Sequence, residues 1–458
     1  MTKKQARTFG GTTLRRFWFP VVLTIVVVLA FVALGPLSAG PTAAERLATF
    51  APVGAGDGAT AFAAPPDASP TEREIAEWFE TVRQFPDTVD AYVLLGNAYL
   101  QHVREVGDPS DYSRAEAAFG EALRREPANL DAVIGKGVLA LARHDFAGAL
   151  ELGERAVAMS PRSARAHGVM VDALTELGRY DEAVASAQQM VDLRPDLSSF
   201  SRVSYQRELH GDIDGAIEAM SRAFEASVGA AIENREYIRV LIGDLHLLKG
   251  EVATAEQIYR ASLEASPEFV WALVGMARAD AARGDLEAAI SGYQQAVAKL
   301  PLPEFLIALG ETQAAAGHDV EACRTDELVH AIQALFAANG VNVDLELALF
   351  EANHGDPEAA IDLATRAYET QPNVKAADAL GWALHRAGRS AEAERYADEA
   401  LRLGSPYGQF HFHAGMVALQ LRDDAAAREH LGRALAAPAT LSALDLAAAR
   451  EAFERLDG

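Results

Sequence analysis

The stretch GNAYLQHVREVGDPSDYSRAEAAFGEALRREP, residues 96–127, contains the pattern from which the architecture follows. It ends at Pro127, and proline disfavours helix at the residue that precedes it. Apolar residues recur with helical periodicity on both sides of a central turn, and the same arrangement returns along the chain. Other prolines keep a spacing of 34 residues: Pro127, Pro161 and Pro195; Pro267 and Pro301; Pro372 and Pro406. This period predicts a row of helical hairpins.

The first of these hairpins resembles the tetratricopeptide-repeat (TPR) signature, with some extra residues between its two helices. The residues that carry the resemblance are Gly96, Tyr99, Tyr112, Ala115, Phe119, Ala122 and Pro127. Looser copies continue to about residue 440. The resemblance implies an all-α TPR solenoid over residues 69–440, with about ten helix-turn-helix repeats. In such repeats small residues let paired helices approach, and larger rings fill the space between units.

Two segments depart from the repeat. The unit within residues 196–235 lacks the closing proline, and the unit before residue 345 has Asp326 where an aromatic residue is usual. We therefore expect irregular pitch or a break in the array at residues 196–235 and 320–345.

Composition and charge narrow the class of protein. Half of the residues are hydrophobic and only 7% are aromatic, which suits closely packed helices better than a sheet. The first 44 residues hold five of the 41 basic residues and none of the 65 acidic ones, so the remainder carries a formal charge of −29. Such a surface argues against nucleic-acid binding and favours partners with basic patches. The single cysteine, Cys323, excludes an intrachain disulfide.

The N-terminus contains a long apolar segment. Residues 17–37, FWFPVVLTIVVVLAFVALGPL, have no charged side chain, and about 20 apolar residues suffice for a helix to cross a bilayer. We expect a transmembrane signal anchor, with the basic residues 1–16 cytoplasmic and the repeats extracytoplasmic. The alternative is a signal peptide cleaved after Ala44, which would leave a secreted soluble protein.

Two further segments complete the predicted domain organisation. Residues 38–68 are rich in Ala, Gly and Pro, which predicts a flexible linker. Residues 441–458 predict a terminal helix that caps the array and covers its apolar end.

No catalytic constellation stands out in the sequence. It contains no H-E-x-x-H, C-x-x-C or G-x-S-x-G motif. His318, Cys323 and His330 form the only local group with soft metal ligands, but His318 belongs to a predicted turn. We therefore predict a protein that is not an enzyme, with no cofactor, no metal and no small-molecule substrate.

Proteins with TPR arrays bind peptides in a concave groove formed by the first helix of each unit. Alignment of the units predicts that the following residues face this groove: Trp271, Trp382, His385, Tyr205, Tyr237, Asp244, Glu311 and Asp378. Rings in acidic surroundings suit basic or apolar-aromatic segments. The alternative for each aromatic residue is that its ring packs between units as part of the core.

The resemblance implies a membrane-tethered scaffold that mediates protein–protein interaction on the extracytoplasmic side. The alternative is an accessory TPR subunit of a membrane enzyme or transporter, acting in assembly, maturation or metal handling. Fold alone does not choose between the two.

Overall fold

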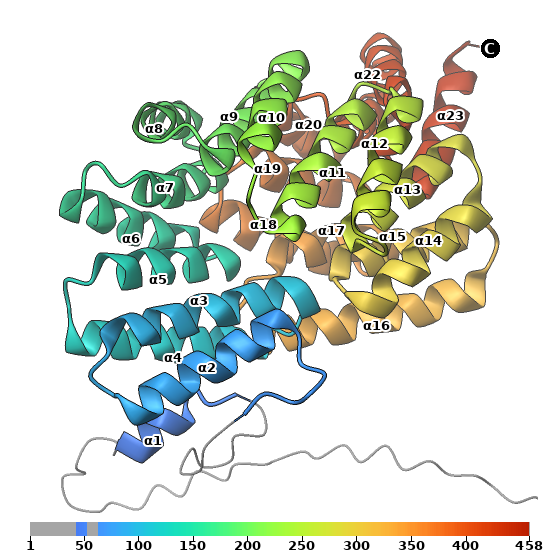
Figure 1. Ribbon diagram of the computed structural model, residues 1–458. Helices are drawn as coiled ribbons and strands as arrows, with labels where there is room; N and C mark the ends of the chain where they lie inside the picture. The colour runs from blue at the N-terminus through green and yellow to red at the C-terminus, as the bar shows by residue number, and fades with distance from the viewer. Residues whose placement is uncertain (1–42, 53–62, 458) are drawn as a thin grey trace, which may run out of the picture. The chain divides into compact units, whose positions relative to one another are not determined.

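The computed structural model describes residues 43–52 and 63–457. These residues form α-helices and one short 3-10 helix, η1, and no strand (Figure 1). The helices, in chain order, are α1 (Ala43–Ala48), α2 (Pro70–Gln84), α3 (Val89–Val106), α4 (Ser110–Arg125), α5 (Leu130–Ala142), α6 (Phe146–Met159), α7 (Ala164–Glu176), α8 (Tyr180–Leu193), α9 (Leu197–Leu209), α10 (Ile213–Ala226), α11 (Ile232–Leu248), α12 (Val252–Ala265), α13 (Val270–Arg283), α14 (Leu286–Lys299), α15 (Pro303–Ala315), α16 (Asp319–Ala338), α17 (Asp344–His354), α18 (Pro357–Thr370), α19 (Val374–Arg386), α20 (Ser390–Ala400), α21 (Gly408–Gln420), α22 (Asp424–Ala436), η1 (Pro438–Thr440) and α23 (Ala443–Asp457).

The helices pair as hairpins, from α3 with α4 to α21 with α22, which makes ten hairpins in the described part of the chain. Local chemistry forms the turns. Gly211 adopts a positive φ of 77°, which ends α9, and the Asp212 side chain then accepts the Gly215 N–H at 3.0 Å to cap α10. The all-α repeat fold predicted from the sequence is therefore confirmed.

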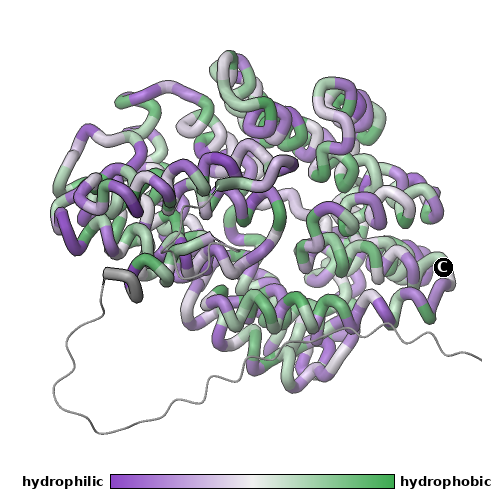
Figure 2. Tube along the Cα trace, turned by 60° about the horizontal axis from the view of Figure 1, so that its bottom comes forward, coloured by the Kyte–Doolittle hydropathy of each residue, from purple (hydrophilic) through white to green (hydrophobic). Residues whose placement is uncertain are grey.

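Close packing of the helices depends on small residues beside large rings. The Tyr259 ring of α12 is fully buried, and it lies between Gly243 of α11 and Gly275 of α13. A Cβ atom on these two glycines would lie 2.5 Å and 2.6 Å from Tyr259 Cε1. Figure 2 shows hydrophobic and hydrophilic residues alternating along the helices, as expected when one side of each helix is buried. The repeat thus fixes both the small residue and the ring that it faces.

The two irregular segments behave differently. Around residues 196–235 the helices α8 to α11 pack on one another in the ordinary way, so the array is continuous there. The helix α16 is 20 residues long, and α16 and α17 are the only consecutive α-helices between α2 and α23 with hardly any close backbone contact. They meet through side chains, including Val329 and Phe350 in one buried cluster. The predicted irregularity at residues 320–345 is therefore present as a wide join, that is, a place where two consecutive helices, α16 and α17, are not closely packed.

The helical array coils far enough for its later units to touch its earlier ones. The Val374 N–H of α19 donates to the Tyr180 hydroxyl oxygen of α8 at 2.9 Å, and Ser405 Oγ donates to the Leu209 carbonyl at 2.6 Å. These residues are 194 and 196 positions apart in the sequence. At Gly178 a Cβ atom would collide with the Pro372 carbonyl oxygen, so a glycine is required for this approach. Successive turns of the array are therefore held together by contacts at the hairpin ends.

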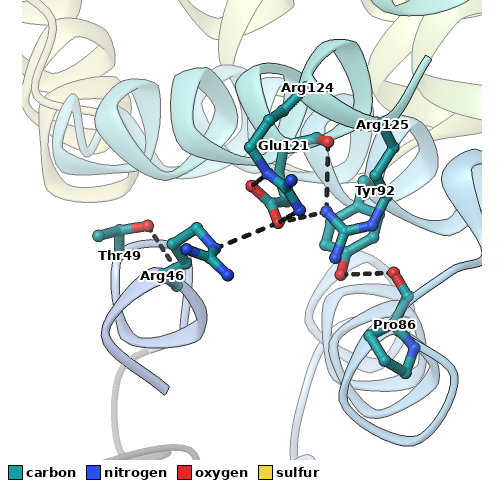
Figure 3. Close-up of polar contacts among 7 residues, drawn as sticks. All are labelled: Arg46, Thr49, Pro86, Tyr92, Glu121, Arg124 and Arg125. Atoms are coloured by element: carbon teal, nitrogen blue, oxygen red, sulfur yellow. Dashed lines mark hydrogen bonds and ion pairs between the residues drawn. The ribbon is translucent and has the colours of Figure 1, made fainter. Parts of the chain in front are cut away.

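Residues 46–52 pack against the first helices. Phe50 is 2% exposed, and its carbonyl accepts a hydrogen bond of 2.6 Å from the Tyr99 hydroxyl. Figure 3 shows Arg46 extending toward Glu121 of α4, at 3.6 Å, while Arg124 and Arg125 approach the same carboxylate. This segment covers the apolar end of the array.

The prediction of a flexible linker over residues 38–68 is therefore wrong for residues 46–52. The Ala- and Gly-rich composition conceals Leu47 and Phe50, whose side chains join the core of the first hairpin. Burial of a ring of this size stabilises the ordered segment by about 2 kcal/mol, which composition alone does not reveal.

The C-terminal segment packs beyond its neighbour in sequence. The helix α23 packs on α22, as a cap does, and it also contacts α15 and α21. The turn η1 lies against α11 and α13, where Ala439 is 6% exposed. The segment from Ala437 onward therefore runs across the inner side of the array.

None of the helices in the described residues is both long and apolar enough to span a bilayer. The predicted basic N-terminus, residues 1–16, and the predicted anchor, residues 17–37, lie outside the described residues.

Candidate functional site

A cavity of about 790 Å³ lies on the side of the array that the first helices form. Its walls come from α9, α11, α13, α15, α17 and α19, and η1 with the start of α23 contributes to its lining. Its volume is in the range of roughly 300–1,000 Å³ that is usual for ligand pockets. The coiled array thus encloses a space that can bury a ligand or part of a partner.

Carboxylates outnumber cations in this cavity. The Arg278 guanidinium lies 3.2 Å from Asp244 Oδ1, and Asp244 also accepts a hydrogen bond of 2.6 Å from the Tyr259 hydroxyl. Lys375 Nζ lies 5.3 Å from the centre of the Tyr205 ring. Against these two cations the lining has six acidic residues: Glu208, Asp244, Glu304, Glu311, Glu346 and Asp445. The lining therefore has a net negative formal charge, which attracts cationic ligands.

Three rings form a ladder along one side of the cavity. Tyr237 of α11, Trp271 of α13 and Phe305 of α15 are each 34 residues apart and occupy the same position in successive units. The ring centroids of Tyr237 and Trp271 are 5.4 Å apart, and those of Trp271 and Phe305 are 5.2 Å apart, both edge-to-face. A side pocket of about 230 Å³ opens on this ladder, with Asp244 and Glu304 in its lining. Aromatic faces and carboxylates therefore meet in one place.

The cavity alters the protonation of its acidic groups. Burial raises the pKa of Glu208, whose Oε1 atom accepts a hydrogen bond of 2.8 Å from the Tyr407 hydroxyl. Burial, followed by the negative charge of Glu346, raises the pKa of Glu304. Burial also raises the pKa of Asp445 to about 6. Carboxylates that have lost water in this way are stabilised by a cationic ligand.

The structure brings five of the eight predicted groove residues together. Tyr205, Tyr237, Asp244 and Glu311 line the large cavity, and Trp271 lines the side pocket. They lie on α9, α11, α13 and α15, the first helices of four successive hairpins. Whether this surface binds a peptide stays a prediction.

Trp382 is not an exposed platform, and the expectation that its ring faces the groove is wrong. It is 3% exposed, its Nε1–H donates to Asn353 Oδ1 at 2.7 Å, and its ring stacks on His413 with centroids 4.1 Å apart. Asp378 is likewise 3% exposed, and both of its carboxylate oxygens lie 2.9 Å from His413 Nδ1. The reason is that α19 is packed by α17 and α21 on the side that the alignment assigned to the groove.

His385 lies beside this buried cluster. Its Nδ1 atom is 3.0 Å from Ser390 Oγ, and its ring stacks on Trp382. Burial lowers the pKa of His385 to about 4, so the ring is neutral at pH 7. It does not line the cavity and supports α19 instead.

Several cavity residues were missed by the sequence analysis, although one left a signal. Phe305 is 34 residues after Trp271, as Trp271 is after Tyr237, and this spacing would have identified it. Glu208 lies on α9, three residues after Tyr205, whereas Tyr407 and Asp445 carry no such signal, because they reach the cavity from a later turn of the coil and from the C-terminal segment.

Metal ligands are not grouped in the described part of the chain. No set of three or more His, Cys, Asp or Glu side chains there could hold a metal ion. His318 approaches Glu287 at 3.2 Å and His330 approaches Glu351 at 3.9 Å, so the two histidines face different partners. Cys323 is exposed on α16.

Comparisons with known proteins agree with the fold. Two family models, each described as tetratricopeptide repeat, match the chain: one over residues 140–203, the other over residues 108–164, 210–268 and 379–443. No curated protein matches its sequence.

Solved structures with a similar course of the chain share little sequence. The APC/C hetero-tetramer Cut9–Hcn1 is 16% identical with a TM-score of 0.40, covering 84% of this chain and 83% of that one. Human IFIT1 bound to m7Gppp-AAAA is 17% identical with a TM-score of 0.46, over 69% and 72%. A thermophilic TPR protein of Thermus thermophilus is 21% identical with a TM-score of 0.35, over 39% and 92%. The two family models support the tetratricopeptide repeat, and these structures, with their low TM-scores, add nothing to that support.

Proposed function

Because this chain belongs to the tetratricopeptide-repeat family, we propose that it is a scaffold that holds a segment of another protein in its central cavity. The observation that carries the proposal is the lining of the cavity. Rings and carboxylates from the first helices of successive units converge there, on the surface where arrays of this family hold peptides. A basic or apolar-aromatic segment fits this lining.

Two features of the cavity favour a protein segment as the ligand. The side pocket on the aromatic ladder is of the size of one side chain, whereas the main cavity is several times larger. Tyr237 is 38% exposed, so its ring offers apolar area to a ligand without a change of packing. A short extended segment could place one side chain on the ladder and the rest of its backbone along the first helices.

The proposal includes a membrane tether. Residues 17–37 contain no charged side chain, and five basic residues precede them. This arrangement favours a single span with the array on the extracytoplasmic side. The scaffold would then present its cavity to proteins at the membrane surface.

Photo-cross-linking tests the proposal. A photoreactive phenylalanine analogue at the position of Tyr237 in the full-length chain should give an adduct with a discrete protein in native membranes. The matched control is the same analogue at the position of Val184, which is 44% exposed on α8 and does not line the cavity. Intact mass of the extracted protein should include residues 17–37.

Two results would contradict the proposal. Equal adducts from both positions would mean that capture is unspecific, and no adduct from Tyr237 would mean that the cavity holds no partner. A mature chain beginning near residue 45 would remove the tether and leave the scaffold. The identity of the captured protein also decides whether it belongs to a membrane enzyme or transporter.

A further inference from the structure

The aromatic ladder has a repeated geometry that sets it apart from the other rings of the array. Several rings are sealed between helices, as Tyr259 is, with no exposed surface. Tyr237 is exposed and Trp271 is partly buried, and both border the 230 Å³ side pocket. The third ring, Phe305, is 3% exposed and packs edge-to-face against Trp271. The pocket is therefore bordered by two rings, and a third ring packs against one of them.

The charges around the ladder are not balanced. Arg278 also lines the side pocket, but its guanidinium is matched by Asp244 at 3.2 Å. Glu304 has no cationic side chain within 4 Å among the described residues, although it lines both spaces. One carboxylate thus remains at the pocket without a counter-ion.

The titration of nearby groups agrees with this imbalance. Burial, together with the negative charges of Asp244 and Glu304, raises the pKa of the Tyr237 hydroxyl to about 12. Burial raises the pKa of Glu304 as well. A cation in the pocket would oppose both shifts, because an opposite charge nearby favours the ionised form of each group.

We propose that the side pocket lined by Tyr237, Trp271 and Glu304 binds one lysine or arginine side chain of the partner segment. This rests on the proposed function, because it assumes a protein ligand in the cavity. The two rings accept the alkyl stem and the charged group through their faces, and Glu304 supplies the counter-charge. The pocket thereby selects a basic residue at one position of the segment.

Blocked pentapeptides with one varied central residue test the proposal on the full-length chain. The central residue is lysine, arginine, norleucine or ε-acetyl-lysine among alanines, and affinity is measured by calorimetry. Norleucine keeps the alkyl stem without charge, and acetyl-lysine keeps the length without charge. Lysine and arginine should bind roughly five- to thirtyfold more tightly than either neutral residue, the range of a desolvated cation–π contact with a counter-charge. Added salt should reduce the difference.

Two substitutions locate the binding site. Glu304→Gln keeps the shape of the side chain, removes its charge and should remove most of the preference for lysine. Trp271→Leu keeps an apolar side chain without the aromatic ring and should weaken lysine and arginine binding alike. Glu264→Gln is the matched control, because this carboxylate is exposed on α12 and does not line the cavity. It should leave all four affinities unchanged.

Four outcomes would overturn the proposal. Norleucine binding as tightly as lysine would make the pocket apolar, and a lysine preference that survives Glu304→Gln would place the cation elsewhere. Free arginine amide binding as tightly as the peptide would indicate a small-amine site. If Tyr237 still cross-links its partner equally in the Glu304→Gln background, this subsite fails while the proposed function stands.

Discussion

At the scale of single residues, similar rings on the first helices of different hairpins have different roles. Trp271 and Trp382 both lie on the first helix of a hairpin, yet Trp271 borders the cavity and Trp382 is sealed in the core. The difference comes from Asn353 and His413, which meet the indole of Trp382 from α17 and α21. An alignment of the repeats predicts on which face of a helix a residue lies, but it does not show which neighbouring side chains cover that face.

We expect Trp382→Ala to lower the free energy of unfolding by about 3–5 kcal/mol, because the change leaves a cavity and Asn353 without its donor. Urea unfolding followed by circular dichroism measures the loss. Tyr237→Ala is the control, and since its ring is partly in water it should lower stability by less than half as much. A stability unchanged by Trp382→Ala would contradict the assignment of this ring to the core.

At the scale of elements, α23 brings a carboxylate into the cavity in addition to its apolar packing. Asp445, in its first turn, reaches into the cavity, where burial raises its pKa to about 6. His413 of α21 and His354 of α17 oppose this shift, whereas Glu311 of α15 adds to it. Because the pKa is higher in the folded than in the unfolded chain, the folded state binds the proton more tightly. Stability should therefore fall as the pH rises from about 4 through 6.

Replacing this carboxylate tests the seating of α23. We expect Asp445→Asn to raise stability at pH 8 by on the order of 2 kcal/mol, and by nearly nothing at pH 4, where the folded wild type is already protonated. Asp181→Asn is the control, because Asp181 is exposed on α8 and does not line the cavity. A loss of stability at pH 8 in Asp445→Asn would show that the carboxylate is satisfied where it lies.

At the scale of the whole array, which is described over residues 43–52 and 63–457, contacts between successive turns of the coil close the cavity. Tyr180, Leu209, Val374 and Phe410 form one buried cluster, although they come from hairpins almost 200 residues apart. A linear repeat protein has only neighbour contacts and loses structure unit by unit. Here the long-range cluster should couple early and late units in unfolding.

The coupling can be weakened by removing one oxygen. Tyr180→Phe deletes the acceptor of the buried Val374 N–H, and we expect a loss of about 1–3 kcal/mol. Hydrogen exchange should accelerate at the start of α19 as well as in α8. Tyr396→Phe is the control, because its hydroxyl meets Arg395 at the surface, at 2.6 Å. Faster exchange confined to α8 would mean that the turns are not coupled.

The hairpins can be read directly from the amino-acid sequence, because their causes are local. The 34-residue period, the small residue opposite each ring and the glycine-aspartate turns act within one or two neighbouring units, so a linear pattern contains them. It also identified the wide join near residues 320–345 and five residues of the cavity. Other features follow from tertiary packing: which rings stay open, the burial of Phe50 at the start of the array, and the meeting of Glu208, Tyr407 and Asp445 in one cavity. The last of these depends on the coil returning after almost 200 residues, and small angles between successive hairpins, which no single residue sets, add up to that return.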